Sequence, residues 1–281
     1  MTERDLTPIE QRAGIYFKRD DLYAPFGQSD VNGGKLRQCV MLIQKAVEAN
    51  PNIKGIITYC SIHSPQGPIT AAVAEQMKLP CIVAYGGTTE VNTYKEDMPR
   101  LVMAHGGQIE IVASSGRHNV LKAKAEAIAR QKGYFIVQYG INLDNYGDVL
   151  IGAVADQVKN LPDGLSNLYV TCGSGITASG IIVGIERYQK RVGRVHLVAT
   201  AFDREEKVKN TLRRFGVSRQ FVYHDLFHTP GFVYEKKQFM RVGGVKLHPQ
   251  YEAKTMKYLL DKRLITENSL FWIVGAEPKS R

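Results

Sequence analysis

One stretch decides the fold: Leu168-Tyr-Val-Thr-Cys-Gly-Ser-Gly-Ile-Thr-Ala-Ser-Gly180. Its first four residues form a short apolar run that is typical of a buried strand. Glycines interrupt the run at Gly173 and Gly175, and a helix is predicted to follow as far as about Tyr188. A strand that leads through a tight turn into a helix is the repeating unit of a parallel sheet.

The rest of the chain repeats this alternation of short apolar runs and segments with helical periodicity. The expected strands are 53–59, 81–85, 109–112, 134–139, 195–201 and 271–274. The expected helices are 36–47, 69–77, 99–104, 120–131 and 146–159. The sequence therefore predicts an α/β fold with parallel sheets flanked by helices, and no linker marks a domain boundary.

Length and composition exclude several classes of protein. The 281 residues, 44% hydrophobic and 23% charged, suit one large or two modest globular domains and exclude a disordered, collagen-like or coiled-coil chain. No run approaches the roughly 18 apolar residues that span a bilayer, and the first residues lack a signal peptide's basic and apolar start. We expect a cytoplasmic protein without membrane contact. Its four cysteines form no C-x-x-C pair, so we expect them reduced and partly buried.

Positive charge is concentrated in one part of the chain. The formal net charge is +10, and residues 187–246 with Glu186 hold fourteen basic and six acidic residues, which is most of that excess. A basic face attracts polyanions such as nucleic acid. An ordinary solvated surface is the alternative interpretation.

A lysine follows two glycines near the N-terminus, in Asn32-Gly-Gly-Lys-Leu-Arg37. Lys35 is placed at the entrance of the helix expected over 36–47. The positive end of the helix dipole and the loss of water both disfavour its charge, which suits an amine nucleophile or general base. By itself, a lysine after glycines is more often a surface loop residue.

Two strand-to-helix turns offer anion sites. In the stretch 171–180, glycines let backbone N–H groups approach a phosphate, and Ser174 and Thr177 add hydroxyl donors. In Cys60-Ser-Ile-His-Ser-Pro-Gln-Gly67, the serines and the helix start suit a carboxylate, although simple N-capping explains them as well.

Two further groups of polar residues lie in the second half of the chain. Tyr251 and Glu252 open Tyr251-Glu-Ala-Lys-Thr-Met256, where Glu252 also suits an ordinary helix start. His224 and His228 have the i, i+4 spacing of metal ligands, but the Glu of H-E-x-x-H is missing and no third ligand is evident. We therefore predict no metal site.

Taken together, these motifs resemble the pyridoxal-phosphate (PLP) enzymes of fold type II, the tryptophan synthase β-like fold. Within them the chain is most similar to the branch of 1-aminocyclopropane-1-carboxylate (ACC) deaminase and D-cysteine desulfhydrase. The matching motifs, in order, are Lys18–Leu22, Gly33–Arg37, Ser64–Gln66, Ala71–Ala74, Cys172–Gly180 and Tyr251–Met256. The resemblance runs nearly end to end and implies two open, mostly parallel sheets flanked by helices. It also implies a large PLP-binding domain, 1–36 plus 142–281, a small domain, 37–141, and a homodimer.

The resemblance also implies roles for individual residues. Lys35 would form the internal aldimine and move the Cα proton, and Tyr251 would stand at the active-site face. The phosphate loop would comprise Gly173, Ser174, Gly175, Ile176 and Thr177. Glu252 would stand beside the pyridine nitrogen, and Ser64, also a catalytic candidate, would hold the substrate carboxylate together with Gln66. Pro65 replaces an asparagine that in the family contacts the cofactor's ring hydroxyl.

Three functions follow from this resemblance. The first is a PLP-dependent lyase or deaminase acting at Cα of an amino acid. The second is a PLP enzyme acting on an amino-acid group attached to a nucleic acid base, as in thymidine hypermodification by some bacteriophages, with residues 187–246 as the polyanion surface. The third is a degenerate PLP-binding protein without turnover.

Overall fold

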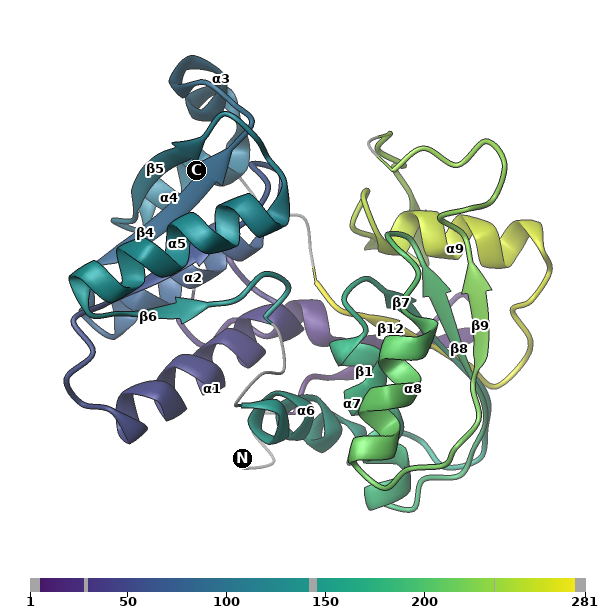
Figure 1. Ribbon diagram of the computed structural model, residues 1–281. Helices are drawn as coiled ribbons and strands as arrows, with labels where there is room; N and C mark the ends of the chain where they lie inside the picture. The colour runs from purple at the N-terminus through teal and green to yellow at the C-terminus, as the bar shows by residue number, and fades with distance from the viewer. Residues whose placement is uncertain (1–5, 28–29, 142–145, 235, 276–281) are drawn as a thin grey trace. The chain divides into compact units, whose positions relative to one another are not determined.

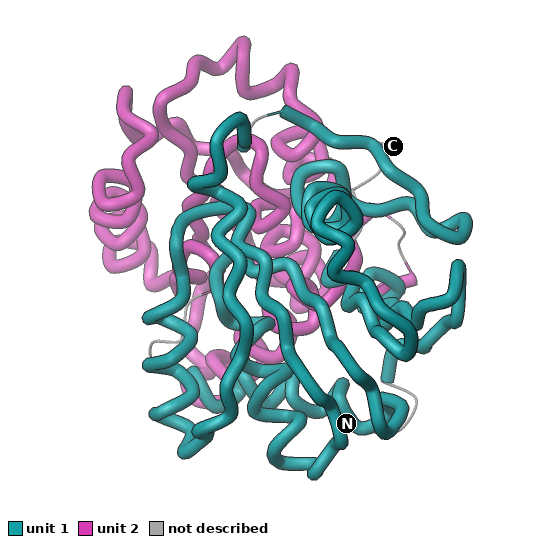
Figure 2. Tube along the Cα trace, turned by 90° about the vertical axis from the view of Figure 1, so that its right-hand side faces the viewer, with its two compact units in different colours: residues 1–23, 147–277 teal, residues 24–146, 278–281 magenta. Residues whose placement is uncertain are grey.

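The computed structural model describes residues 6–27, 30–141, 146–234 and 236–275. The chain divides into two compact units, which Figure 2 distinguishes by colour. Unit 1 comprises residues 1–23 and 147–277, and unit 2 is built from residues 24–146. Each unit contains its own sheet, parallel in unit 2 and mostly parallel in unit 1.

Unit 2 is an open parallel sheet with helices on both faces (Figure 1). Its strands, in the order β5-β4-β3-β6, are Gln108–Ala113, Cys81–Gly86, Gly55–Tyr59 and Tyr134–Val137. Helix α5, His118–Lys132, packs against all four strands, and α2, Gln66–Gln76, packs against β3 and β4. The remaining helices are α1, Gly34–Ala49, α3, Glu90–Lys95, and α4, Asp97–Ala104.

Burial explains why the strands of unit 2 read as continuous apolar runs. All five residues of β3 are buried, as expected for a parallel strand that is covered on both faces. Ile57 and Ile82 pack with Leu121 and Ala125 of α5 in one cluster. Helix α5 ends at Gly133, whose φ of +71° is the left-handed conformation that closes a helix.

Unit 1 is built on a six-stranded sheet in the order β1-β2-β12-β7-β8-β9. These strands are Ile9–Arg12, Ile15–Arg19, Ser269–Ile273, Leu165–Cys172, Val192–Ala199 and Val222–Asp225. Only the edge strand β1 is antiparallel to its neighbour. A hairpin of β10, Arg241–Val242, and β11, Val245–Lys246, lies outside this sheet.

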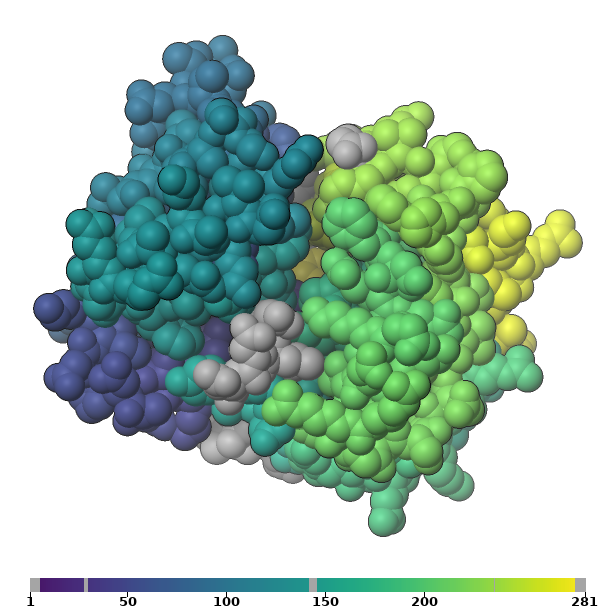
Figure 3. All heavy atoms as spheres, viewed as in Figure 1, coloured from purple at the N-terminus to yellow at the C-terminus, as the bar shows by residue number. Residues whose placement is uncertain are grey.

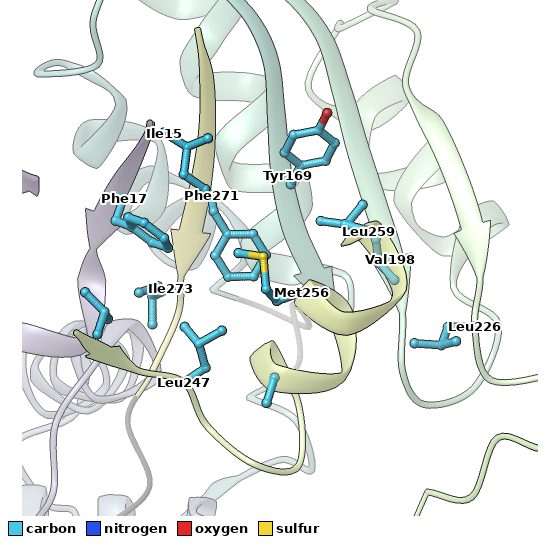
Figure 4. Close-up of a cluster of buried hydrophobic side chains, with 12 residues drawn as sticks. Ile15, Phe17, Tyr169, Val198, Leu226, Leu247, Met256, Leu259, Phe271 and Ile273 are labelled. Carbon is cyan, nitrogen blue, oxygen red and sulfur yellow. The ribbon is translucent and has the colours of Figure 1, made fainter. Parts of the chain in front are cut away.

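The helices of unit 1 are α6, Gly147–Ala155, α7, Ile176–Arg187, α8, Glu205–Arg214, and α9, Glu252–Asp261. Short 3₁₀ turns cover Asp20–Leu22 and Asp156–Val158. Helix α7 packs on β7 and β8, and α6 and α8 pack on α7. Figure 4 shows the apolar cluster in which Met256 and Leu259 of α9 meet Phe271 of β12 and Tyr169 of β7.

The structure confirms the predicted parallel α/β architecture and adds elements that the sequence did not reveal. Strands β1, β2 and β9, the short hairpin and helices α3 and α8 were not predicted. The division between the units also differs from the predicted domains, since unit 2 begins at residue 24 and extends to 146. The reason is that α1 packs against α2. None of the described helices is both long and apolar enough to cross a membrane.

Candidate active site

Lys35 is the second residue of α1. The helix begins after Gly33, whose φ of +96° is a conformation that favours glycine. The partly buried Lys35 donates from Nζ to the carbonyl oxygen of Gly140, 3.1 Å away, just beyond the carboxyl end of β6. The glycine turn therefore aims this amine at the carboxyl edge of the sheet in unit 2.

Gln66 is connected to the same place. Its Oε1 accepts from the N–H of Gly140 at 2.7 Å, and its Nε2 donates to Thr58 Oγ1 at 2.8 Å and to the Gln138 carbonyl at 3.0 Å. Both amide hydrogens are thus used inside unit 2. In this arrangement the Gln66 side chain positions Gly140, and through it Lys35, and it has no hydrogen left for a substrate carboxylate.

The loop before α2 uses its own donors in the same way. His63 N–H donates to Ser61 Oγ, Ser64 N–H donates to the Ser61 carbonyl, and Gln66 N–H donates to Ser64 Oγ, at 3.3, 2.9 and 3.3 Å. Pro65, at the N-cap of α2, and Pro68 carry no N–H. The predicted carboxylate site around Ser64 therefore has few backbone donors to offer.

The glycine loop of unit 1 differs from the loop before α2. Gly175 is the N-cap of α7 with a φ of +85°, and a Cβ there would lie 3.1 Å from Val208 Cγ2. A Cβ on Gly173 would meet nothing within 4 Å. Gly173 and Ser174 are partly exposed, whereas Gly175, Ile176 and Thr177 are buried. A phosphate group can therefore approach the backbone from the side of Gly173. There it meets the N-terminus of the twelve-residue helix α7, which carries the positive end of the helix dipole.

Glu252 lies at the first position of α9 and is only 2% exposed. Its Oε1 accepts from the N–H of Val274, 3.0 Å away, at the carboxyl end of β12. Burial raises the pKa of Glu252 to about 7, although the backbone N–H groups of Val274 and Gly275 act in the opposite direction. A carboxyl group that titrates near neutrality suits a hydrogen bond with a pyridine nitrogen.

Tyr251 is the N-cap of α9 and is held by neighbours in unit 1. Its hydroxyl lies 3.1 Å from that of Tyr234, and its ring centroid lies 5.0 Å from that of His248. Lys254 donates to the carbonyls of Val233 and Tyr234 and so fixes the segment that carries Tyr234.

The structure therefore brings the predicted residues together in two sets. Lys35 and Gln66 share Gly140 in unit 2, with Ser64 one hydrogen bond away from Gln66. In unit 1, strand β7, which leads into the glycine loop, is joined to α9 by the hydrogen bond between Thr171 Oγ1 and Thr255 Oγ1, 2.9 Å.

Two residues of these sets, Gly140 and Tyr234, were not predicted from the sequence. Gly140 could have been found, because it comes soon after a predicted strand, where parallel sheets place functional loops. Tyr234 has no comparable signal.

The histidines of residues 224–228 have protein partners. His224 Nε2 lies 3.0 Å from His196 Nδ1, and His224 Nδ1 lies 3.2 Å from the Tyr258 hydroxyl. His228 Nδ1 lies 2.7 Å from Asp225 Oδ2. Burial lowers the pKa of His196 to about 4. Among the described residues, no three His, Cys, Asp or Glu side chains gather as metal ligands.

The four cysteines are all buried, without a disulfide. Burial raises the pKa of Cys39, Cys60 and Cys172 to about 12, so these side chains are thiols at neutral pH and not nucleophiles.

The basic stretch is partly neutralised by acids of its own. Helix α8, on the face that Figure 3 shows, pairs Lys209 with Glu205 at 2.8 Å, and Arg219 pairs with Glu186 at 2.9 Å. Part of the positive charge of this stretch is therefore balanced locally by ion pairs.

Comparison with known proteins places these observations in a family. Residues 4–218 match the family model described as pyridoxal-phosphate dependent enzyme. A relative, the O-seryl-dTMP PLP-dependent decarboxylase of Salmonella phage ViI, is 24% identical over 96% of this chain and 80% of its own length. The D-cysteine desulfhydrase of Salmonella paratyphi B is 27% identical over 94% and 87%.

Solved structures agree on the fold. An ACC deaminase homologue has a TM-score of 0.76 at 22% identity, over 96% of this chain and 89% of its own. Serine racemase from Dictyostelium discoideum has a TM-score of 0.60 at 12% identity, over 98% and 93%. With a family match over most of the chain and both sheets of fold type II, this chain belongs to the pyridoxal-phosphate dependent enzymes.

Proposed function

We propose that this enzyme removes the carboxylate from an amino-acid group carried by a nucleotide. The phage decarboxylase, whose name gives O-seryl-dTMP as its substrate, aligns with nearly the whole chain. In the reaction, the bond between Cα and the carboxylate breaks, carbon dioxide leaves, and a proton is added at Cα.

The loop before α2 and the first residues of that helix, 61–68, carry this proposal. An enzyme that keeps the substrate carboxylate must hold it with several donors, whereas a departing carboxylate is destabilised by loss of hydrogen bonds and water. In this loop the N–H groups of His63, Ser64 and Gln66 are satisfied internally, and Pro65 and Pro68 have none. A loop of this kind favours loss of the carboxylate over its retention.

Bound pyridoxal phosphate supplies an electron-withdrawing ring that stabilises negative charge at Cα. In unit 1, the N–H groups of the loop 173–177 are proposed to bind the phosphate, and Glu252 to hold a proton at the pyridine nitrogen. In unit 2, Lys35 is proposed to carry the cofactor covalently and to deliver the proton to Cα, aligned by Gly140. Tyr251, fixed by Tyr234, is proposed to orient the substrate.

The test is to incubate the cofactor-loaded enzyme with O-seryl-dTMP and analyse the nucleotide by mass spectrometry. We expect a product lighter by one carbon dioxide, and an equivalent amount of released carbon dioxide. An unchanged nucleotide would contradict the proposal.

A second candidate is a lyase or deaminase of free amino acids, favoured by the similarity to D-cysteine desulfhydrase. It predicts sulfide and ammonia from D-cysteine, or ammonia from ACC, with the nucleotide left intact. The same enzyme preparation therefore separates the two activities.

A further inference from the structure

An exposed aromatic ring stands at the carboxyl end of β8. Phe202 comes three residues after the strand ends at Ala199 and is 53% exposed. It is supported from one side by Phe227, whose ring centroid is 5.5 Å away at an interplanar angle of 48°. Phe227 is held in turn because its N–H donates to the Ala199 carbonyl at 3.0 Å. Phe202 is thus held in place by Phe227 while about half of the residue stays exposed to solvent.

An arginine with unused donors lies over this ring. Arg204 Cζ is 5.4 Å from the centroid of Phe202. The Arg204 backbone N–H donates to the Tyr223 hydroxyl at 2.7 Å, which anchors the residue. Its Nε is buried without a hydrogen-bond partner in the described part of the chain, and no described carboxylate pairs with its guanidinium. A guanidinium in this condition is suited to an anion, above all to a phosphate.

Both residues border the glycine loop. Strands β7 and β8 pair so that Cys172 lies opposite Ala199, and the segments that follow leave the sheet at the same edge. A Cβ on Gly175 would lie 3.8 Å from Arg204 Cβ. The charges of Arg204 and Lys207 also oppose the rise that burial causes in the pKa of Cys172, the residue before the loop. All of these residues are in unit 1, so the patch and the loop belong to one compact body.

We propose that Phe202, supported by Phe227, and Arg204 form a nucleotide subsite, in which the base stacks on Phe202 and Arg204 binds a phosphate. This inference rests on the proposed function, since it gives the nucleotide part of the substrate a place beside the cofactor loop. Aromatic rings bind bases through their faces, and arginine adds cation–π and phosphate contacts. The phosphate belongs either to the nucleotide or to the cofactor, and binding experiments separate these sources.

The experiment measures binding without turnover. The holoenzyme is reduced with borohydride, which keeps the cofactor attached and blocks reaction, and is titrated calorimetrically with dTMP and with thymidine. Phe202→Ala is expected to weaken binding of both ligands by about 5- to 150-fold, the range for loss of one base stack. Arg204→Gln is expected to weaken dTMP by about tenfold and to leave thymidine unchanged.

Two variants serve as matched controls. Phe239→Ala removes another exposed phenylalanine, 68% exposed, and Arg213→Gln removes an exposed arginine of α8. Both are expected to bind dTMP as the wild type does. Phe202→Tyr is expected to retain binding, because a tyrosine ring also stacks.

Several results would overturn the subsite. The first is a Phe202→Ala variant that binds as tightly as Phe239→Ala. The second is a Phe202→Ala variant that becomes monomeric while its affinity for dTMP is unchanged. This result would identify Phe202 as a subunit contact. The third result concerns Arg204→Gln. If this variant binds the cofactor more weakly and shifts the ³¹P signal of bound cofactor, and still binds dTMP more tightly than thymidine, the phosphate that Arg204 binds is the cofactor's. The assignment of Arg204 to the nucleotide is then wrong.

Failure of the proposed function gives a different pattern. If the enzyme binds dTMP through Phe202 and Arg204 but leaves O-seryl-dTMP intact, the subsite stands and the proposed reaction is wrong. If the enzyme decarboxylates O-seryl-dTMP but all variants bind dTMP as the wild type does, the proposed function stands and the subsite is wrong.

Discussion

The two units present the same architectural feature, the carboxyl edge of a parallel sheet, with opposite chemical character. In unit 1 the glycine loop leaves space above Gly173, and the buried Glu252 has a pKa near neutrality. In unit 2 the N–H groups of His63, Ser64 and Gln66 are satisfied by the loop before α2 itself, and the Gln66 amide bonds to Thr58, Gln138 and Gly140. One edge is arranged to receive a charged group, and the other is arranged to hold an amine in place.

This difference shows that strand topology alone does not decide what an edge binds. Both loops join a parallel strand to a helix, and both contain serine. The outcome depends on whether the backbone donors are left available or are consumed by neighbouring hydroxyl and carbonyl groups. The following predictions test this contrast.

The largest effect is expected from Lys35→Ala. Removing the amine that lies 3.1 Å from the Gly140 carbonyl would eliminate the proposed covalent attachment of the cofactor and the proposed proton delivery, and we expect turnover to fall by about 10²- to 10⁴-fold. Borohydride reduction and peptide mapping of the wild type are expected to place the label on Lys35. The control Lys45→Ala changes an exposed lysine on the same helix, paired with Glu48, and should leave turnover unchanged. A label on another lysine would show that the assignment is wrong.

Much of the fold was predictable from the sequence, because apolar runs and helical periodicity directly reflect burial. The first two strands were missed for a physical reason. Lys18 of β2 looks like a surface residue in the sequence, yet it is fully buried. Its Nζ donates to the Thr7 carbonyl and to Asn160 Oδ1, and it lies 5.6 Å from the centre of the Trp272 ring. Partners this far apart in sequence leave no local pattern.

The candidate site was predictable to a similar degree. Motif order singles out Lys35, the glycine loop and Glu252 as candidates, because glycines and helix starts leave a signature, and their roles stay predictions. The hydrogen bonds within the loop before α2 and those of the Gln66 side chain leave no such signature. A serine looks the same in the sequence whether it binds a ligand or caps its own loop.

The next effect concerns stability at the glycine loop. Gly175→Ala forces a side chain into a φ of +85° and places its Cβ 3.1 Å from Val208 Cγ2, so we expect a loss of about 1–3 kcal/mol in the free energy of unfolding. Gly173→Ala has no such conflict, and its stability is expected to stay within about 0.5 kcal/mol of the wild type. Chemical denaturation of the apoenzyme measures both.

The same pair of variants examines the phosphate assignment. If backbone approach at Gly173 receives the cofactor phosphate, Gly173→Ala weakens cofactor binding while its stability remains normal. If Gly173→Ala binds the cofactor with normal affinity, the loop does not bind the cofactor phosphate.

Glu252→Gln is expected to change the pH dependence of stability in the apoenzyme. The folded pKa of about 7 exceeds the unfolded value of 4.5, so between these limits the folded state binds more protons than the unfolded state. This contribution is complete below about pH 4.5 and is lost as the pH rises through 7. Relative to Glu252→Gln, the wild type should therefore lose roughly 1–3 kcal/mol between about pH 5 and pH 8.

Thermal denaturation across this pH range measures the slope. The control Glu267→Gln alters an exposed carboxylate just before β12, and its curve should parallel the wild type. Parallel curves for Glu252→Gln and the wild type would mean that Glu252 titrates normally and is not held in the environment that the structure shows.

The smallest effect is expected from Pro65→Asn, which tests the character of the loop in unit 2. Pro65 has φ −67° and ψ −9°, a conformation that asparagine adopts without strain, so folding should be preserved. The substitution adds a backbone N–H and a side-chain amide at the N-cap of α2. If the substrate carboxylate lies against this loop, the new donors stabilise it before it leaves, and ground-state stabilisation raises the barrier.

One such hydrogen bond contributes about 1 kcal/mol, so decarboxylation should slow by about fivefold while the substrate binds somewhat more tightly. Single-turnover kinetics with O-seryl-dTMP separates the two quantities. Thr89→Asn is a matched control, because it replaces the N-cap of α3 in the same unit with another residue that caps well, and it should leave both quantities unchanged. Unaltered kinetics in Pro65→Asn would show that the carboxylate departs elsewhere. Faster decarboxylation would reverse the argument, because the loop would then be short of donors that the transition state needs.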